Sequence, residues 1–332
     1  MKSLIKKLVE TVGPSGYESL IREVVRAEIE AFADEIYVDA MGNLIARKKP
    51  EKEDATRLML SAHIDEIGIM VTHVDKKGFA RFTTIGGVRP HTCLGSRVRF
   101  LNGAVGVIGG ERLEKPNQVH TIEEMYIDVG AKDADKNPIK IGDVAAFDRP
   151  FEDLGDRLIA KAMDDRVSAA ILIETMKNVR KSPLDLYYVF STQEEVGLRG
   201  ATTAAYAIDP HIGIAVDVTS TGDTPRGSKM DVSLGAGPAI KVKDGGMLAD
   251  PRVVDWMVKS AKNIKIPYQM EILLGGTTDA RAMQISRAGM PAGCVSVPTR
   301  YIHSPSEMVD MNDVLNAVKL ISEMISKPIN LD

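Results

Sequence analysis

The segment FSTQEEVGLRGA places two glutamates, Glu194 and Glu195, directly after an apolar run. Neighbouring residues on a strand point to opposite faces, so the two carboxylates should have different surroundings. One of them could hold a metal ion while its neighbour stays free to move a proton. A solvated charged turn after a strand is the ordinary alternative, so the choice depends on the other residues of the chain.

Other residues of metal-binding type also follow apolar runs. RLMLSA is followed by His63 and Asp65, IGIAV by Asp217, and CVSVPTRYI by His303, while Asp164 in KAMDDR lies in the first turn of an expected helix. Ligands of open α/β sheets bind outside the carboxyl ends of the strands, so we expect these side chains to meet at one sheet edge. Two histidines and several carboxylates suit a pair of zinc or cobalt ions.

Each of these residues also has an ordinary explanation. His63 could be a core histidine paired with Asp65, and Asp217 could cap a helix. Asp164 and Asp165 could lie in a first helical turn because acids favour the positive end of the helix dipole. The common placement at strand ends favours the dinuclear metal site over these separate explanations. Four other histidines lack this setting and are expected to be surface or structural residues: His73, His91, His120 and His211.

Composition narrows the class of protein. A chain of 332 residues predicts about two domains, and 44% hydrophobic residues with a formal net charge of -4 are typical of a soluble globular protein. We therefore expect no nucleic-acid partner and no membrane partner. The segment MKSLIKKLVETVG is typical of an amphipathic helix and not of a signal peptide. Cys93 and Cys294 lack a CxxC partner, which predicts no disulfide and a cytoplasmic location.

The order of the expected elements predicts an α/β fold with an insertion. Residues 1 to about 31 have helical patterns, interrupted at GPSGYE, where Ser15 and Glu18 have the spacing of a capping box. Between about Gly68 and Lys161 nearly every signal is strand or turn, which indicates a small β-barrel or sandwich. After this region strands and helices alternate, so we expect a parallel or mixed sheet covered by helices on both faces.

These stretches resemble the tetrahedral (TET) aminopeptidases, the glutamyl, leucyl and lysyl aminopeptidase group of dinuclear-metal metallopeptidases. The matching stretches are GPSGYE, SAHIDEIG, KAMDDR, QEEVGLRGA, AVDVT and RYIHSPSE, in the family's order. The resemblance implies a catalytic α/β domain of the dinuclear zinc aminopeptidase kind, residues 1–67 and 162–332. It also implies an inserted PDZ-like β-barrel, residues 68–161, that serves oligomerisation and substrate access, and a homo-oligomer between a dimer and a dodecamer.

The resemblance further implies two divalent metal ions per chain, zinc or cobalt. Asp164 would bridge the two ions. His63 and Asp217 would complete one site, and Glu195 and His303 would complete the other. The long gap between His63 and Asp164 leaves room for the inserted barrel. Relatives of the carboxypeptidase and deacylase type carry their extra domain between Asp217 and His303, where this chain has only strands and helices.

Two residues would be catalytic by the same resemblance. Glu194 would take a proton from the water held between the metals, leaving a bridged hydroxide, and would later deliver the proton to the leaving amine. Asp65 would orient His63 through its second ring nitrogen. The implied activity is that of a metal-dependent aminopeptidase, which removes N-terminal residues from peptides with a free amino terminus. The stretch GGTTDARA, Gly275–Ala282, has an extra-looking threonine, so no substrate contacts are assigned to it.

Two alternatives remain open. An endoglucanase or another hydrolase could use the same scaffold, although a glycosidase needs two carboxylates flanking a sugar bond and has no use for two histidine-bearing metals. A metal-binding protein without catalysis is the second alternative. Binding alone would not need an unligated acid such as Glu194 beside the metals.

Overall fold

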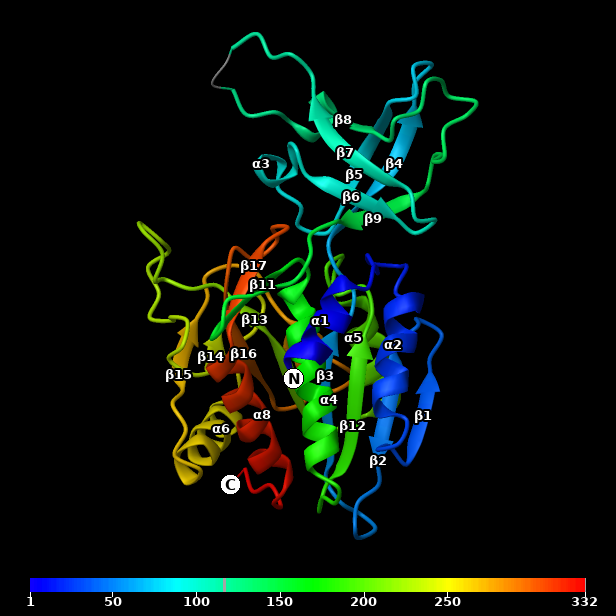
Figure 1. Cartoon of the computed structure of the whole chain (residues 1–332). Helices are drawn as coiled ribbons and strands as arrows, with labels where there is room; N and C mark the ends of the chain where they lie inside the picture. The colour runs from blue at the N-terminus through cyan, green and yellow to red at the C-terminus, as the bar shows by residue number, and fades with distance from the viewer. Residues whose placement is uncertain (116–117, 332) are drawn as a thin grey trace.

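The computed structural model describes residues 1–115 and 118–331 and consists of two parts (Figure 1). A small closed barrel stands on a larger α/β domain, and both chain termini lie on the larger domain. Within the described residues, the larger domain is built on an 11-stranded mixed sheet. The strand order is β1-β2-β12-β3-β13-β16-β17-β11-β10, with β14 paired to β16 and β15 paired to β14.

The strands of the larger sheet are β1 (Glu35–Val38), β2 (Leu44–Lys48), β3 (Arg57–His63), β10 (Glu152–Asp153), β11 (Arg157–Ala160), β12 (Asp185–Ser191), β13 (Ile212–Thr219), β14 (Ala239–Lys243), β15 (Gln269–Ile272), β16 (Ala292–Arg300) and β17 (Glu307–Asp310). Strands β12, β3, β13 and β16 are parallel neighbours. Every residue of β13 is buried, as expected for a strand covered on both faces. The carboxyl ends of these four strands meet at the sheet edge that faces the barrel (Figure 1).

Helices cover both faces of this sheet (Figure 1). On one face α4 packs against α1, α8 and β13, and it is buried nearly all round because neighbours surround it. On the other face α5 and α7 pack together over a separate apolar cluster. The helices are α1 (Lys2–Glu10), α2 (Ser19–Ile29), α4 (Met163–Asn178), α5 (Arg199–Ile208), α6 (Pro251–Asn263), α7 (Asp279–Gln284) and α8 (Met311–Ile325).

The inserted barrel has its own apolar core, which includes Phe82, Phe100 and Ile127. Its strands are antiparallel and close in the order β4-β5-β8-β7-β6-β9. Its elements are β4 (Gly68–Val74), β5 (Ala80–Ile85), α3 (Pro90–Cys93), β6 (Arg97–Phe100), β7 (Val105–Gly110), the short 3-10 helix η1 (Ile122–Glu124), β8 (Met125–Asp128) and β9 (Val144–Phe147). The predicted α/β fold with a helix-covered mixed sheet and an inserted β-barrel is confirmed.

The last barrel strand ends at Phe147, before the end of the expected insert at residue 161. Strands β10 and β11 lie inside the expected range 68–161 but pair with the larger sheet, where Leu158 is opposite Val309. A short alternating run such as RLIA has the same pattern in a barrel and at a sheet edge. Local periodicity therefore does not specify which sheet the strand joins.

Two further expectations can be compared with the structure. Cys93 and Cys294 are both free and buried, in agreement with the prediction that they form no disulfide. Among the helices of the described residues, none combines the length and the apolar character needed to cross a bilayer.

Candidate active site

Five candidate metal ligands lie together at the carboxyl edge of the parallel strands. His63 is the last residue of β3, Glu195 follows β12, and Asp217 lies near the end of β13. Asp164 begins α4, and His303 lies in the loop after β16. The parallel arrangement explains this convergence, because each strand delivers the residues after it to the same edge.

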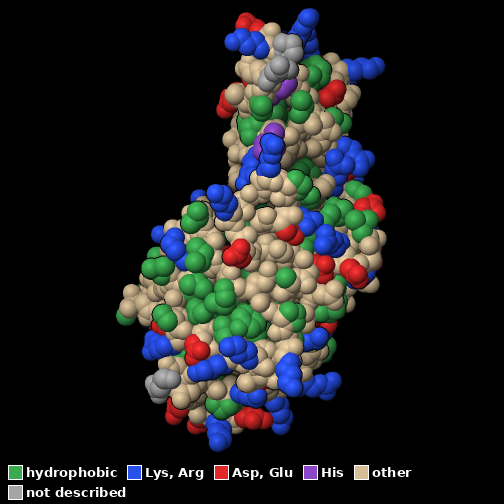
Figure 2. Space-filling view, turned by 90° about the vertical axis from the view of Figure 1, so that its left-hand side faces the viewer, with side chains coloured by type: hydrophobic (Ala, Val, Ile, Leu, Met, Phe, Trp, Pro, Cys, Tyr) green, Lys and Arg blue, Asp and Glu red, His purple; other side chains and the backbone are tan. Residues whose placement is uncertain are grey.

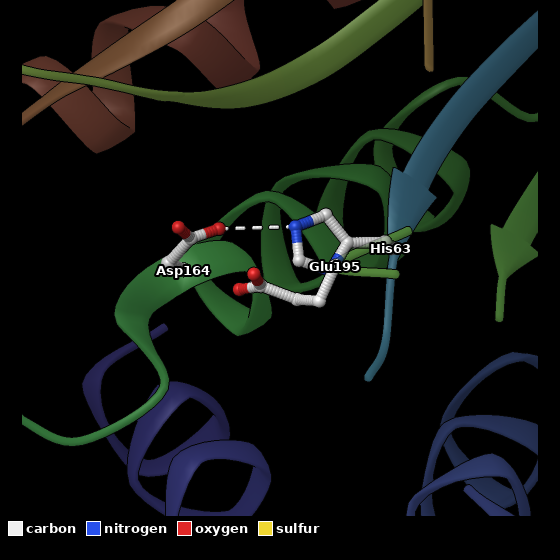
Figure 3. A group of neighbouring side chains, drawn as sticks. All are labelled: His63, Asp164 and Glu195. Carbon is white, nitrogen blue, oxygen red and sulfur yellow. Dashed lines mark hydrogen bonds and ion pairs between the residues drawn. The ribbon is translucent and has the colours of Figure 1, made fainter. Parts of the chain in front are cut away.

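Asp164 lies between the two histidines. Its Oδ1 atom is 3.0 Å from Nε2 of His63, and its Oδ2 atom is 3.3 Å from Nε2 of His303. The same nitrogen of His303 lies 3.1 Å from Oε2 of Glu195. Figure 3 shows the carboxylate of Glu195 turned toward Asp164 beside the ring of His63, with each side chain coming from a different element. One carboxylate with an oxygen toward each histidine is suited to a bridging position.

A second group of possible ligand atoms includes a residue that sequence reasoning missed. His63, Asp165 and Asp217 each offer one atom within 4.8 Å of the other two, as do His63, Asp164 and Glu195. Asp165 is fully buried, and its carboxylate oxygens make no well-formed hydrogen bond to the described residues. The sequence did hold one sign that Asp165 could be a ligand. It adjoins Asp164 in KAMDDR, ahead of a largely apolar helix. An acid that only favoured the helix dipole would be solvated, so that explanation is wrong for Asp165.

The buried carboxylates of this site need protons or cations to balance their negative charge. Burial raises the pKa of Asp165 and of Asp217 well above the usual range, and nearby carboxylates raise both further. Burial lowers the pKa of His303, but its bonds to Asp164 and Glu195 outweigh burial and raise that pKa to about 11. Oε1 of Glu195 is also buried without a hydrogen-bond partner. The buried imidazole of His63, the partly buried imidazole of His303 and carboxylates with unbonded oxygens fit divalent cations, which would replace the protons.

Asp65 connects three segments of the site. Its Oδ1 atom lies 3.4 Å from Nδ1 of His63, consistent with the expected orienting role. Its carboxylate also accepts the backbone N–H groups of Glu194, at 3.0 Å, and Glu195, at 3.2 Å. The hydroxyl of Ser15 donates to Asp65 at 2.6 Å. Asp65 therefore holds the turn that carries the two glutamates as well as the histidine ring, a role that the sequence did not reveal.

The predicted capping box at Ser15 and Glu18 is wrong. Helix α2 begins at Ser19, and Glu18 makes no side-chain cap hydrogen bond to it. Oε1 of Glu18 accepts the N–H groups of Gly16, at 2.7 Å, and of Gln193, at 3.1 Å. The Ser15 hydroxyl is committed to Asp65. The spacing matched a cap by coincidence, because Ser15 instead bonds to Asp65, and Glu18 bonds to the turn that carries Glu194 and Glu195.

Glu194 differs from Glu195 in its surroundings, as adjacent strand-end residues should. Its Oε2 atom is 3.9 Å from Nε2 of His63, and its side chain is 11% exposed. It lines a cavity of about 890 Å³ above the sheet edge. Burial raises the pKa of Glu194 well above its usual range, the charge of His63 opposes that rise, and other carboxylates add to it. The segment from Gly275 to Thr278 also lines this cavity.

The family of the chain follows from comparison with known proteins. A family model described as M42 glutamyl aminopeptidase matches residues 42–320. The chain belongs to this family. The M42 chain is similar to a lysyl aminopeptidase from Pyrococcus furiosus, with 38% identity over 98% of this chain and 96% of that protein. The predicted family is therefore confirmed, and the chain is a member of a peptidase family.

Solved structures agree with this membership. An aminopeptidase from the archaeon Desulfurococcus kamchatkensis superposes on the M42 chain with a TM-score of 0.94 at 39% identity, covering 98% of this chain and 94% of that one. The TET1 peptidase of Pyrococcus horikoshii, described as able to assemble into a tetrahedron or a large octahedral shell, gives a TM-score of 0.90 at 32% identity, covering 98% and 99%.

Two further buried acids of the M42 chain accept hydrogen bonds from residues in or next to the site. Glu307, the last residue of RYIHSPSE, accepts the N–H groups of Asp164, at 2.9 Å, and His303, at 2.8 Å. Asp279 accepts the hydroxyls of Ser61, at 2.6 Å, and Ser191, at 2.5 Å, near the ends of β3 and β12. Sequence reasoning missed both acids. Only the inclusion of Glu307 in a matching stretch pointed to it.

The four remaining histidines belong to neither group of possible ligand atoms. Nε2 of His120 lies 2.8 Å from the carbonyl oxygen of Glu111, and Nδ1 of His211 accepts the N–H of Arg57 at 3.0 Å. His73 and His91 are exposed on the barrel. These positions agree with the surface or structural roles expected for the four residues.

Proposed function

We propose that the chain is a metal-dependent aminopeptidase that removes N-terminal residues from peptides with a free amino terminus. The observation that carries this proposal is the meeting of two histidines with buried carboxylates at the floor of a cavity, beside Glu194, whose Oε2 atom lies 3.9 Å from His63. The described activities of the M42 relatives support it. The surplus of carboxylates at the cavity floor suits the ammonium group of such a substrate.

Two divalent ions, zinc or cobalt, fit the site. His63, Asp164 and Asp217 would hold one ion, with Asp165 as a further carboxylate close to His63 and Asp217. Asp164, Glu195 and His303 would hold the other, because Nε2 of His303 lies 3.3 Å from Asp164 and 3.1 Å from Glu195. When bound, such ions act as Lewis acids that activate water and polarise the scissile carbonyl.

Glu194 is proposed as the group that moves the proton. Its side chain lines the cavity with Oε2 3.9 Å from Nε2 of His63, whereas Oε2 of Glu195 lies closer, 3.1 Å, to Nε2 of His303. A carboxylate in this position can accept a proton from the attacking water and later donate it to the leaving amine. A positioned acid or base of this kind contributes typically 10²–10⁴-fold in rate. Asp65 keeps Glu194 in place through the backbone N–H bond.

We also propose that the protein is a homo-oligomer, between a dimer and a dodecamer. In the described part of the chain β15 is an edge strand, paired to β14 alone, and it exposes Met270 (44%) and Ile272 (56%). Leu274, just beyond it, is 84% exposed. Figure 2 shows hydrophobic side chains gathered on this side of the larger domain. Exposed apolar edge strands are usually covered by another chain. Light scattering that finds only monomers in the metal-loaded protein would contradict this.

A substrate screen tests the activity. Protein stripped by a chelator and reloaded with zinc or cobalt is assayed on aminoacyl-p-nitroanilides, on their N-acetylated forms and on carboxymethylcellulose. We expect cleavage of the free-amino anilides alone, and only with metal present. Equal cleavage of an N-acetylated substrate would replace the assignment with an endopeptidase or deacylase. Release of reducing sugar from the cellulose derivative would support the endoglucanase alternative instead.

A further inference from the structure

The barrel reaches into the active site through the loop between β5 and β6. A Cβ atom added to Gly86 would lie 3.1 Å from Oε2 of Glu195, and one added to Gly87 would lie 2.6 Å from Cε1 of His303. The loop backbone therefore lies directly against two candidate metal ligands. Its next polar side chain, that of Arg89, is consequently held at a defined place beside the site.

The backbone of Arg89 is anchored while its side chain is exposed. Its carbonyl oxygen accepts from the N–H and hydroxyl of Thr92, at 3.1 and 2.9 Å, and from the thiol of Cys93 at 3.4 Å. Val88 and Cys93 on either side are buried in the barrel core. Within the described part of the chain, the guanidinium of Arg89 has no hydrogen-bond or ion-pair partner. A fixed cation without an acid partner is suited to bind an anionic group.

A second cavity of about 490 Å³ adjoins the first beside His303. Arg89, Tyr301, Ile302 and His303 line both cavities. The remaining wall of the second cavity includes Ile159, Met308 and several polar residues from both domains. The space beyond His303 is therefore bordered by a cation and has room for amino-acid residues.

The two adjoining cavities carry charges of opposite sign at their far ends. The floor near His63 and Asp164 is rich in carboxylates. Two other basic residues of the first cavity already have acid partners, because Nη2 of Arg300 lies 2.6 Å from Asp223 and Nζ of Lys241 lies 2.6 Å from Glu271. Arg226 also lines the first cavity and has no acid partner among the described residues, but it does not line the second cavity. Arg89 is the free cation that lines both cavities. A short zwitterionic peptide has the same arrangement of charges, with its ammonium at one end and its carboxylate at the other.

We propose that the cavity beside His303 is the subsite for the residues on the carboxyl side of the scissile bond, and that Arg89 binds the C-terminal carboxylate of short peptides there. This proposal rests on the proposed aminopeptidase function. A guanidinium can hold a carboxylate with two parallel N–H bonds, which a lysine cannot reproduce. Short peptides with a free carboxylate are therefore the preferred substrates, and the barrel contributes a substrate-binding residue to the catalytic domain.

The test compares three substrates with the same N-terminal residue: a tripeptide with a free carboxylate, its C-terminal amide and the p-nitroanilide. In the wild-type holoenzyme we expect kcat/KM for the free acid to exceed that for the amide by about 10- to 100-fold, the range for hydrogen bonds to a charged group. Arg89→Gln should lower kcat/KM for the free acid to the level of the amide, mainly through KM, and lower kcat/KM much less for the amide and the anilide. Arg89→Lys should retain part of the preference.

Arg97→Gln is the matched control, because Arg97 is exposed on the same barrel and lines neither cavity. It should leave all three substrates unaffected. Equal cleavage of free acid and amide by the wild-type enzyme overturns the proposal without any variant. An equal loss on all three substrates in Arg89→Gln also overturns it, since that indicates a general structural effect. Failure of the wild-type enzyme to cleave even the anilides refutes the proposed function, and the subsite with it.

Discussion

Glu194→Gln separates proton transfer from metal binding at the pair of glutamates. The substitution preserves the size of the side chain and the backbone N–H bond from residue 194 to Asp65. It removes only the ability of the side chain to accept a proton. Glu195→Gln is the matched comparison, because Oε2 of Glu195 lies 3.1 Å from His303, in the cluster that would hold the second ion.

The expected magnitude follows from these different contacts. Oε2 of Glu194 lies 3.9 Å from Nε2 of His63, whereas Oε2 of Glu195 lies 3.1 Å from Nε2 of His303, so substitution of Glu194 should disturb the metal sites less. Loss of a general base costs about 10²–10⁴-fold in turnover. At about 1.36 kcal/mol for each tenfold change in rate, this corresponds to roughly 3–5 kcal/mol of transition-state stabilisation. Glu195→Gln should instead weaken metal binding, and part of its activity should return at high metal concentration.

The measurements are metal content by elemental analysis and turnover at saturating metal, made on both variants and on the wild-type protein. We expect two metals per chain and low turnover in Glu194→Gln, and a loss of metal in Glu195→Gln. If Glu194→Gln loses a metal while Glu195→Gln keeps both, the two roles are exchanged. If Glu194→Gln keeps full turnover with both metals bound, the proposed mechanism is wrong.

Two further substitutions examine how the site is held. Asp65→Asn should lower metal affinity by about 10- to 100-fold in a chelator competition, because it weakens the support of the His63 ring and of the glutamate turn; unchanged affinity would show that Asp65 is dispensable. Gly87→Ala should lower turnover by up to about 10²-fold, since the new methyl group, 2.6 Å from Cε1 of His303, must displace the ring by about 1 Å to reach an ordinary contact. A variant with wild-type turnover and metal content would show that the loop between β5 and β6 moves and that the ring of His303 stays in place.

The principal elements and the positions of the candidate ligands could be predicted from the sequence because they depend on local patterns. Continuous apolar runs such as IGIAV predict buried parallel strands, and parallel strands bring the residues after them to one edge. His63, Asp217 and His303 could therefore be placed together without knowledge of the tertiary structure. The barrel was also predictable as a run of short strands, although the end of the insert was not, since β11 lies inside the expected range and pairs with the larger sheet.

The tertiary structure alone decided which distant side chains support these residues. Ser15 and Glu18 had the spacing of a helix cap, yet they bond to Asp65 and to the N–H of Gln193. Asp165 resembled an ordinary first-turn acid, yet it is buried beside Asp217 without well-formed hydrogen bonds. The approach of Gly87 to His303 also joins segments far apart in the chain. A local sequence pattern indicates the conformation of its own segment. Contacts between distant segments depend on how the whole chain packs.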